Sequence, residues 1–175
     1  MKKTIVAILL LGILISCIGN SSDAQMNGTD LRKSIHLSKC HAYHLIANGH
    51  TEEGIGILDS LWQTYHLDYT ILSGIAAAYY KIGKRDSAFM WLQMEETYID
   101  SMLKCQPTEA LLRDKLPLTY LLKGKEAAKK VEASLSEELR QMARDFFDAC
   151  PTPEDFLNSA VTQFFEAYKD SNYVR

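Results

Sequence analysis

The chain has few of the patterns that mark β-structure or a known catalytic mechanism. β-Branched residues rarely alternate with polar ones, and no Asn-Gly or Asp-Gly turn lies between alternating apolar runs. The motifs Gly-x-Ser-x-Gly, His-Glu-x-x-His and the phosphate-binding loop are also missing. The first absence predicts an all-α fold. The second gives no support for an enzyme or a cofactor, although a site built from scattered residues would escape such a search.

A hydrophobic run long enough to cross a membrane is missing too. Lys2 and Lys3 precede an uncharged apolar stretch, residues 5–15, which has 11 residues. A membrane-spanning helix needs about 17–25 residues, whereas the hydrophobic part of a signal peptide has about 7–15. Residues 19–23 are small or polar and prevent the run from continuing. The stretch therefore predicts an export signal that is cleaved.

The residues at the end of this run indicate lipidation. Leu14-Ile15-Ser16-Cys17 resembles the bacterial lipobox, a branched apolar residue followed by two tolerant positions and a cysteine. The resemblance implies removal of residues 1–16 and lipidation of Cys17, both on its sulfur and on the new N-terminus. Acyl chains anchor a protein without a spanning helix, since each buried methylene contributes about 0.8 kcal/mol. We expect a lipoprotein of the bacterial cell envelope, periplasmic or at the outer membrane or cell surface, with a flexible tether at 17–29.

Basic residues are not in excess either. Without residues 1–16 the chain has 17 basic and 22 acidic residues, a formal charge of −5. An acidic chain with no basic cluster argues against nucleic acid as a partner. It also offers no electrostatic reason for docking on anionic lipid. The only expected contact with a membrane is the lipid anchor.

Three cysteines remain once Cys17 is lipidated: Cys40, Cys105 and Cys150. Their number is odd and no pair has the Cys-x-x-Cys spacing. An oxidising periplasm permits a disulfide, whose pairing the sequence does not give. The other interpretation is that they are free and mostly buried in a helical core.

Helix start and stop signals are frequent after the tether. Thr51, Asp68 and Thr152 fit N-caps, Ser134 with Glu137 matches a capping box, and Pro107 breaks a helix. Glycine follows two of the expected helices. The predicted helices span residues 31–48, 51–65, about 69–82, 86–104, 137–147 and 153–169.

A repeat of 34 residues links the first four helices, because Gly49 and Gly83 are 34 positions apart. Four further pairs share this spacing: Ala42 with Ala76, Leu45 with Tyr79, Gly54 with Ala88, and Leu58 with Leu92. Such a helix-turn-helix period is the signature of tetratricopeptide repeats. Leu72-x-x-Ile75-Ala76-x-x-Tyr79 resembles the family's W-x-x-L-G-x-x-Y, and Ala88-x-x-x-Leu92 resembles its A-x-x-x-F.

The resemblance implies a short superhelix of antiparallel helix pairs within a domain at 30–175. The units are 35–68, 69–104 and a weak third at 108–133, followed by a C-terminal helical cap at 134–170. The sequence departs from the family at Ser38 and His41, and no unit ends in proline. The alternative is an irregular helical bundle in which the 34-residue spacing is accidental.

Tetratricopeptide proteins bind partners along a concave face lined by the first helix of each repeat. The resemblance places these candidate residues on that face: His36, Lys39, Tyr43, Ala47, Thr70, Ser73, Ala77, Tyr80 and Lys81. Tyrosines beside lysines can hold an extended peptide or a carboxylate. Tyr43, Tyr80 and Lys81 are expected to line one groove without being part of the core.

A second candidate site is the segment His36-x-x-x-Cys40-x-x-x-His44. Spacings of four place these side chains on one stripe of a helix. Imidazole and thiolate are ligands for zinc, copper or haem iron, and His66 could supply a fourth ligand. The competing interpretation is a polar surface with one buried cysteine.

The favoured function is a lipid-anchored helical-repeat module that binds a protein or peptide in the envelope, with no catalysis, metal or cofactor. One alternative is metal or haem handling by the His/Cys stripe. Another is a degraded enzyme or substrate-binding lipoprotein. The adjacent pairs Glu52-Glu53 and Glu95-Glu96 point to different sides of a helix, so neither pair is expected to act as acid and base together.

Overall fold

The structure, a computed structural model, describes residues 26–170. The export signal, the lipobox and Cys17 lie outside these residues. Within them, all regular structure is helical and no strand occurs, which confirms the predicted all-α fold class. The helices are α2 (Met26–Ala47), α3 (Thr51–Tyr65), α4 (Thr70–Lys81), α5 (Arg85–Cys105), α6 (Glu109–Lys123), α7 (Lys125–Glu132), α8 (Glu137–Ala149) and α9 (Pro153–Glu166). None of these helices is long and apolar enough to span a bilayer.

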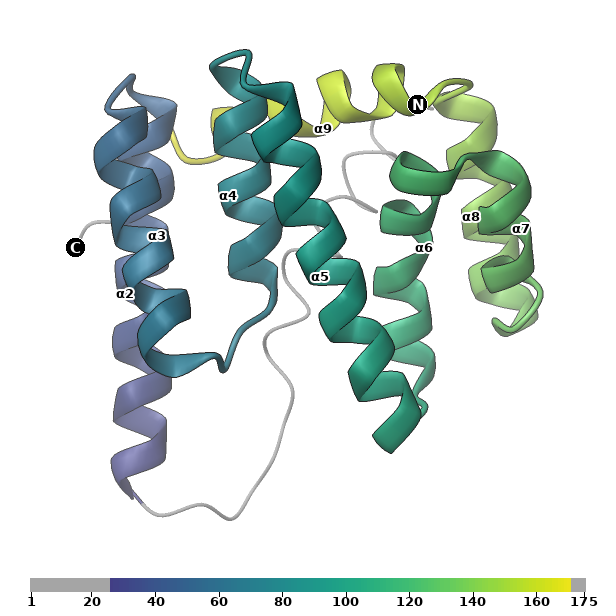
Figure 1. The fold of residues 1–175 in the computed structure, drawn as a ribbon, viewed down its shortest axis with the longest axis horizontal. Coiled ribbons are helices and arrows are strands. Elements are labelled where there is room, and N and C mark those ends of the chain that lie inside the picture. The colour runs from purple at the N-terminus through teal and green to yellow at the C-terminus, as the bar shows by residue number, and fades with distance from the viewer. Residues whose placement is uncertain (1–25, 171–175) are drawn as a thin grey trace.

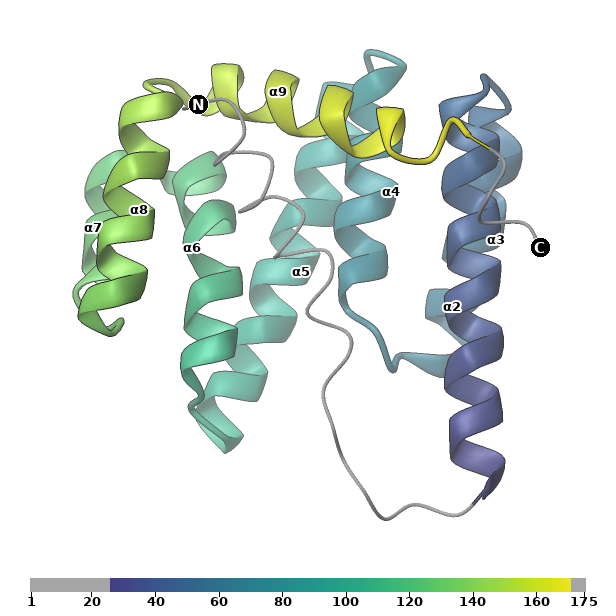
Figure 2. The same cartoon turned by 180° about the vertical axis from the view of Figure 1, so that it is seen from behind.

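Helices α2 to α7 form three consecutive antiparallel hairpins, α2/α3, α4/α5 and α6/α7 (Figure 1). Each hairpin packs on the next through α3 against α4 and α5 against α6. Helix α8 packs on α7 at the end of the row. Figure 2 shows α9 crossing this row near one end of the upright helices, from α8 and α6 toward α2.

The turns at Gly49 and Gly83 have the same geometry, 34 residues apart. Both glycines adopt positive φ angles, +97° and +78°, which disfavour a side chain. In each turn the residue after the glycine donates to a carbonyl five positions back: His50 N to Leu45 O at 2.9 Å, and Lys84 N to Tyr79 O at 3.0 Å. The repeated glycine in the sequence thus marks a repeated helix end.

Close helix pairing within the hairpins depends on small residues. A Cβ added to Gly54 in α3 would lie 2.6 Å from the backbone oxygen of Ala42 in α2, so only glycine fits without a shift. Ala88 occupies the equivalent place in α5 and is buried, as is Ala76. Burial of both alanines is what the predicted close pairing of the helices requires at these positions.

Several local expectations are wrong. Helix α2 begins at Met26, within the segment expected to be tether, and so five residues before the predicted start at 31. The residue before α3 is His50, and Thr51 makes no capping hydrogen bond. No capping box forms at Ser134, because α8 begins only after Ser136. By contrast, Thr152 caps α9 as expected, accepting the backbone N–H of Asp155 at 3.1 Å.

Two buried clusters make up the core. The larger joins the first two hairpins to α6 and α9, and the smaller lies among α6, α7, α8 and the first turn of α9. In the smaller cluster Phe156 packs edge-on against Phe146, with ring centroids 4.7 Å apart. Cys40, Cys105 and Cys150 are free; Cys40 and Cys150 are buried and Cys105 is exposed.

The last helix differs most from the sequence-based expectation. We expected α8 and α9 to close the C-terminal end of the row as a cap. Helix α8 does lie at that end, but α9 turns back and contacts α2, α4 and α6, the first helix of each hairpin (Figure 2). The expected binding face therefore carries a helix of the same chain. This face of α2, α4 and α6 is called the first-helix face below.

Candidate functional site

Aromatic side chains hold the second half of α9 on the first-helix face. Tyr43 of α2 packs edge-on against Phe164, with ring centroids 4.7 Å apart, and against Tyr168 at 5.1 Å. Only 2% of Tyr43 is exposed. Gly74 of α4 makes room for this ring, since a Cβ there would lie 2.6 Å from it. Tyr43 is thus a core residue, contrary to the expectation that it lines an open groove.

Polar contacts follow the edge of α9. The hydroxyl of Tyr80 donates to Asn158 Oδ1 at 2.8 Å, and Arg85 pairs with Glu154 at 2.5 Å on the surface. Lys81 donates to the backbone oxygen of Ile46 at the end of α2. The same Lys81 ammonium lies 5.3 Å from the ring centroid of Phe165. Tyr80 and Lys81 lie on the expected face, where they contact α9.

Lys39 and Thr70, two more predicted binding residues, are buried in a polar network. The ammonium of Lys39 lies 2.5 Å from Asp68 Oδ2 and 3.2 Å from Thr70 Oγ1. Burial alone would raise the pKa of Asp68, but the charge and hydrogen bond of Lys39 bring it below its usual value. This network joins α2 to the start of α4. In this conformation neither Lys39 nor Thr70 is accessible to a partner.

The His/Cys stripe does not form a metal site in this conformation. His36 is exposed and its Nε2 lies 3.6 Å from the Sγ of buried Cys40. His44 contacts the backbone oxygen of Tyr168 through Nδ1 at 2.9 Å. Among residues 26–170 no three His, Cys, Asp or Glu side chains are grouped so that they could hold a metal ion.

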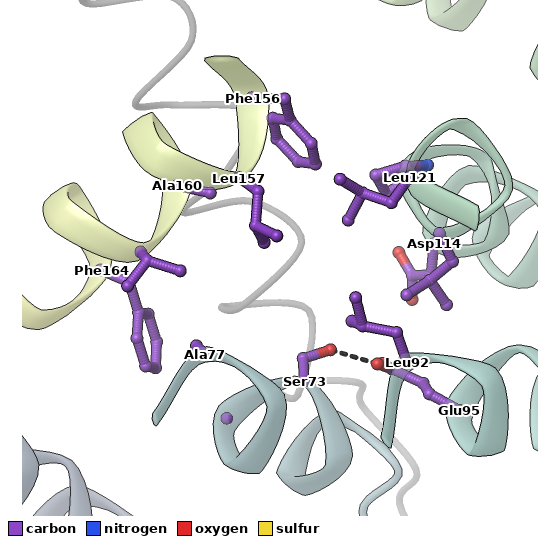
Figure 3. Close-up of a pocket in the computed structure, with 14 residues that line it drawn as sticks. Ser73, Ala77, Leu92, Glu95, Asp114, Leu121, Phe156, Leu157, Ala160 and Phe164 are labelled. Atoms are coloured by element: carbon purple, nitrogen blue, oxygen red, sulfur yellow. Dashed lines mark hydrogen bonds between the residues drawn. The ribbon is translucent and has the colours of Figure 1, made fainter. Parts of the chain in front are cut away.

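A cavity of about 90 Å³ lies beneath α9, along its length from Phe156 to Phe164 (Figure 3). Helix α9 forms one wall, which is entirely apolar. Helices α4, α5 and α6 form the opposite wall, which carries three polar side chains. The lining residues are Ser73, Gly74, Ala77, Leu92, Glu95, Asp114, Pro117, Leu118, Leu121, Phe156, Leu157, Ala160, Val161 and Phe164.

Glu95 is the most unusual side chain of the cavity. It is 3% exposed, and Ser73, predicted as a binding residue, donates a hydrogen bond to its Oε2. Burial raises the pKa of Glu95 to about 8; the Ser73 hydrogen bond opposes this rise, and the negative charges of Asp114 and Asp68 add to it. At neutral pH Glu95 therefore carries a proton.

The neighbouring acids differ from Glu95 in pairing with a positively charged side chain. Asp114 accepts the hydroxyl of Tyr69 at 2.6 Å and the guanidinium of Arg113 at 3.0 Å. Glu96, next in sequence to Glu95, points away from the cavity and pairs with Lys123 at 2.7 Å. The pair Glu95-Glu96 thus points in two directions, as expected, but both side chains are buried.

Of the polar residues of the cavity, only Ser73 was among the predicted binding residues; Glu95 was expected only as part of an adjacent pair that does not act together, and Asp114 was not predicted. Glutamate and aspartate are usually surface residues, so their burial is invisible without the packing partners. No known protein family, curated protein or solved structure matches this chain.

Proposed function

We propose that this chain is a lipid-anchored, tetratricopeptide-like module of the bacterial cell envelope that binds an amphipathic helix of a protein partner on its first-helix face. The lipobox at Leu14–Cys17 supports the anchor, and the 34-residue spacing with its repeated glycine turns supports the repeat. The observation that carries the binding function is α9, an amphipathic helix lying across α2, α4 and α6.

The contacts of α9 resemble those of a helix bound in a groove. Its buried side chains recur every three or four positions, at Phe156 and Leu157, at Val161, and at Phe164 and Phe165. Aromatic anchors in buried pockets, surrounded by polar contacts, are typical of helix recognition. Here Phe164 meets Tyr43 in the core, while Tyr80 and Arg85 contact the exposed edge of α9. The partner helix takes the place of α9, so it should carry a similar aromatic face.

An exchange experiment tests this function. A protease site at exposed Pro151, between α8 and α9, allows the folded chain to be cut without removing any residue of α9. A fluorescent peptide with the sequence of residues 152–170 is then added to the cut protein. The proposal predicts saturable exchange of the peptide into the face, seen as a rise in anisotropy. Failure to exchange in a cut protein that keeps its helical circular dichroism would show that α9 is a permanent part of the fold.

Two variant peptides make the test specific. Unlabelled peptide with Phe164→Ala should compete at least about tenfold more weakly, since it loses a buried aromatic anchor. Unlabelled peptide with Thr162→Ala, which changes an exposed position of α9, should compete like the parent peptide. Equal competition by both would mean that the labelled peptide binds elsewhere.

A further inference from the structure

The cavity beneath α9 has the shape and polarity of a small-molecule site. We propose that it binds a short primary alkylamine, whose ammonium group contacts Glu95 on the side of Asp114 and whose alkyl chain lies against the apolar wall of α9. This inference concerns a small ligand and not the helical partner, because the cavity is enclosed between α9 and the helices α4, α5 and α6 (Figure 3).

The size of the cavity limits the ligand. An engineered protein cavity of about 150 Å³ holds benzene, which has six non-hydrogen atoms. By that ratio a cavity of about 90 Å³ has space for a ligand of roughly four non-hydrogen atoms. Propylamine, with three carbons and one nitrogen, has this size. A sugar, nucleotide or amino acid with a large side chain does not fit.

The polar groups of the cavity call for a ligand that donates hydrogen bonds. Ser73 uses its hydroxyl hydrogen on Glu95 Oε2. No side chain or backbone donor in the described part of the chain reaches the other oxygen, Oε1, although Glu95 is almost completely buried and lines the cavity. Once Glu95 gives up its proton, Oε1 has no donor within the chain, so a ligand with N–H groups can supply one. An ammonium group brings three N–H donors.

The charges around Glu95 favour a cation. Asp114 faces the cavity from α6, and Asp68 acts on Glu95 from the segment before α4. Their positive partners, Arg113 and Lys39, do not line the cavity, and α9 contributes only apolar side chains to it. The two carboxylates make the electrostatic potential at Glu95 negative. In the free protein this potential favours the proton that Glu95 holds. A bound ammonium replaces that proton and leaves the carboxylate as its counter-ion.

The exchange has a defined proton balance. Free protein holds the proton on Glu95 and the free amine is a cation at pH 7. In the complex the ammonium keeps its protons and Glu95 gives its own to solvent. Binding at pH 7 therefore releases about one proton, since Glu95 with a pKa of about 8 is mostly protonated beforehand. A neutral ligand of equal size releases none.

Isothermal titration of the mature chain, residues 17–175 with Cys17→Ser to avoid detergent, measures this directly. The probes are n-propylammonium, n-propanol and sodium ion at equal ionic strength. Comparison of heats in phosphate and Tris buffers gives the number of protons released. We expect saturable binding of propylammonium with release of about one proton, and binding of n-propanol at least tenfold weaker. Equal binding of n-propanol, or displacement of propylammonium by an equal concentration of sodium, would overturn the amine proposal.

Three variants complete the test. Glu95→Gln should weaken propylammonium at least tenfold and abolish proton release. Glu96→Gln, the matched change at a buried carboxyl outside the cavity, should bind within twofold of the parent. Ala160→Leu fills the cavity from α9 and leaves the acids in place, so it should also abolish binding. If Glu95→Gln does not fold, Ala160→Leu decides alone: a folded Ala160→Leu protein that still binds propylammonium contradicts the proposal.

Discussion

The contact of α9 with α2 differs from its contact with α4, α5 and α6. Where α9 meets α2, Tyr43 fills the space between α2, α4 and α9, and Gly74 is needed to admit the ring. Where α9 lies over α4, α5 and α6, the helices leave a cavity whose floor carries the buried acids Glu95 and Asp114. The first arrangement is that of a core and contributes stability. The second arrangement leaves space between the helices unfilled, which lowers the packing contribution to stability. Such unfilled space is expected where a ligand binds.

Loss of the Tyr43 ring should have the largest effect. Tyr43→Ala leaves a cavity against Phe164 and Tyr168, and truncation of a buried aromatic residue costs about 3–5 kcal/mol. Tyr80→Ala removes a half-buried ring with one hydrogen bond to Asn158, and should cost about 1 kcal/mol. Urea unfolding of both variants measures the difference. Equal losses would mean that the two tyrosines belong to the same kind of surface, as the sequence suggested.

The pH dependence of stability should come from Glu95 in the cavity beneath α9. Glu95 has a raised pKa of about 8 in the folded chain and an ordinary value of 4.5 when unfolded. Below 4.5 both states are protonated and the folded chain has no penalty. Between 4.5 and 8 only the unfolded chain releases the proton, so stability falls with rising pH by about 1.4 kcal/mol per unit.

Glu95→Gln isolates this effect. The variant keeps a neutral side chain of the same size at every pH. Relative to the parent it should gain stability steadily from pH 5 to pH 8, measured by urea unfolding at each pH. A stability difference that stays constant over this range would show that Glu95 is ionised in the folded chain. Glu96→Gln serves as the control, because its carboxyl pairs with Lys123.

Substitution of a small buried residue by a larger one distinguishes tightly packed helix contacts from loosely packed ones. Ala88 lies buried between α4 and α5 at the repeat position equivalent to Gly54. Ala88→Leu should destabilise the chain by about 1–3 kcal/mol, because the added carbons have no space. A lowered melting temperature is the expected observation. An unchanged value would contradict the close pairing of the helices at this position.

The same substitution at the cavity should have the smallest effect on stability. Ala160→Leu places its added carbons in the empty space under α9, and filling a cavity commonly adds about 0.5–2 kcal/mol. Thermal unfolding of the two leucine variants side by side gives the contrast. A loss at position 160 as large as that at position 88 would mean that α9 packs as tightly over α4, α5 and α6 as the helices of a hairpin pack on each other.

Local features of this fold were predictable because they depend on neighbouring residues. Gly83 marks a helix end through its own φ preference, and Thr152 with Pro153 marks a helix start through one capping bond. The small residues at Ala42 and Gly54 indicated close helix pairing. Each of these signals acts within one turn or one hairpin, so the sequence pattern contains it.

The path of α9 and the burial of Glu95 could not be predicted in the same way. The apolar face of α9, with Phe164 and Phe165, shows that the helix is buried on one side but not which surface it meets. A helix that caps the end of the row and a helix that returns to α2 both need the same pattern of apolar residues on one face. Glu95 likewise becomes buried only because Ser73 on α4 and the apolar wall of α9 approach it in space. Both features depend on contacts between residues far apart in the chain.

Amide hydrogen exchange of the intact chain tests most directly whether α9 is a displaceable occupant of the first-helix face. The rates are compared between the middle of α9, around Val161, and the middle of α4, around Ile75, under conditions that report opening free energies. Our account predicts that α9 opens in a separate step, at least about 2 kcal/mol below the free energy of global unfolding that protects α4. Protection of Val161 equal to that of Ile75, with both lost only on global unfolding, would contradict it.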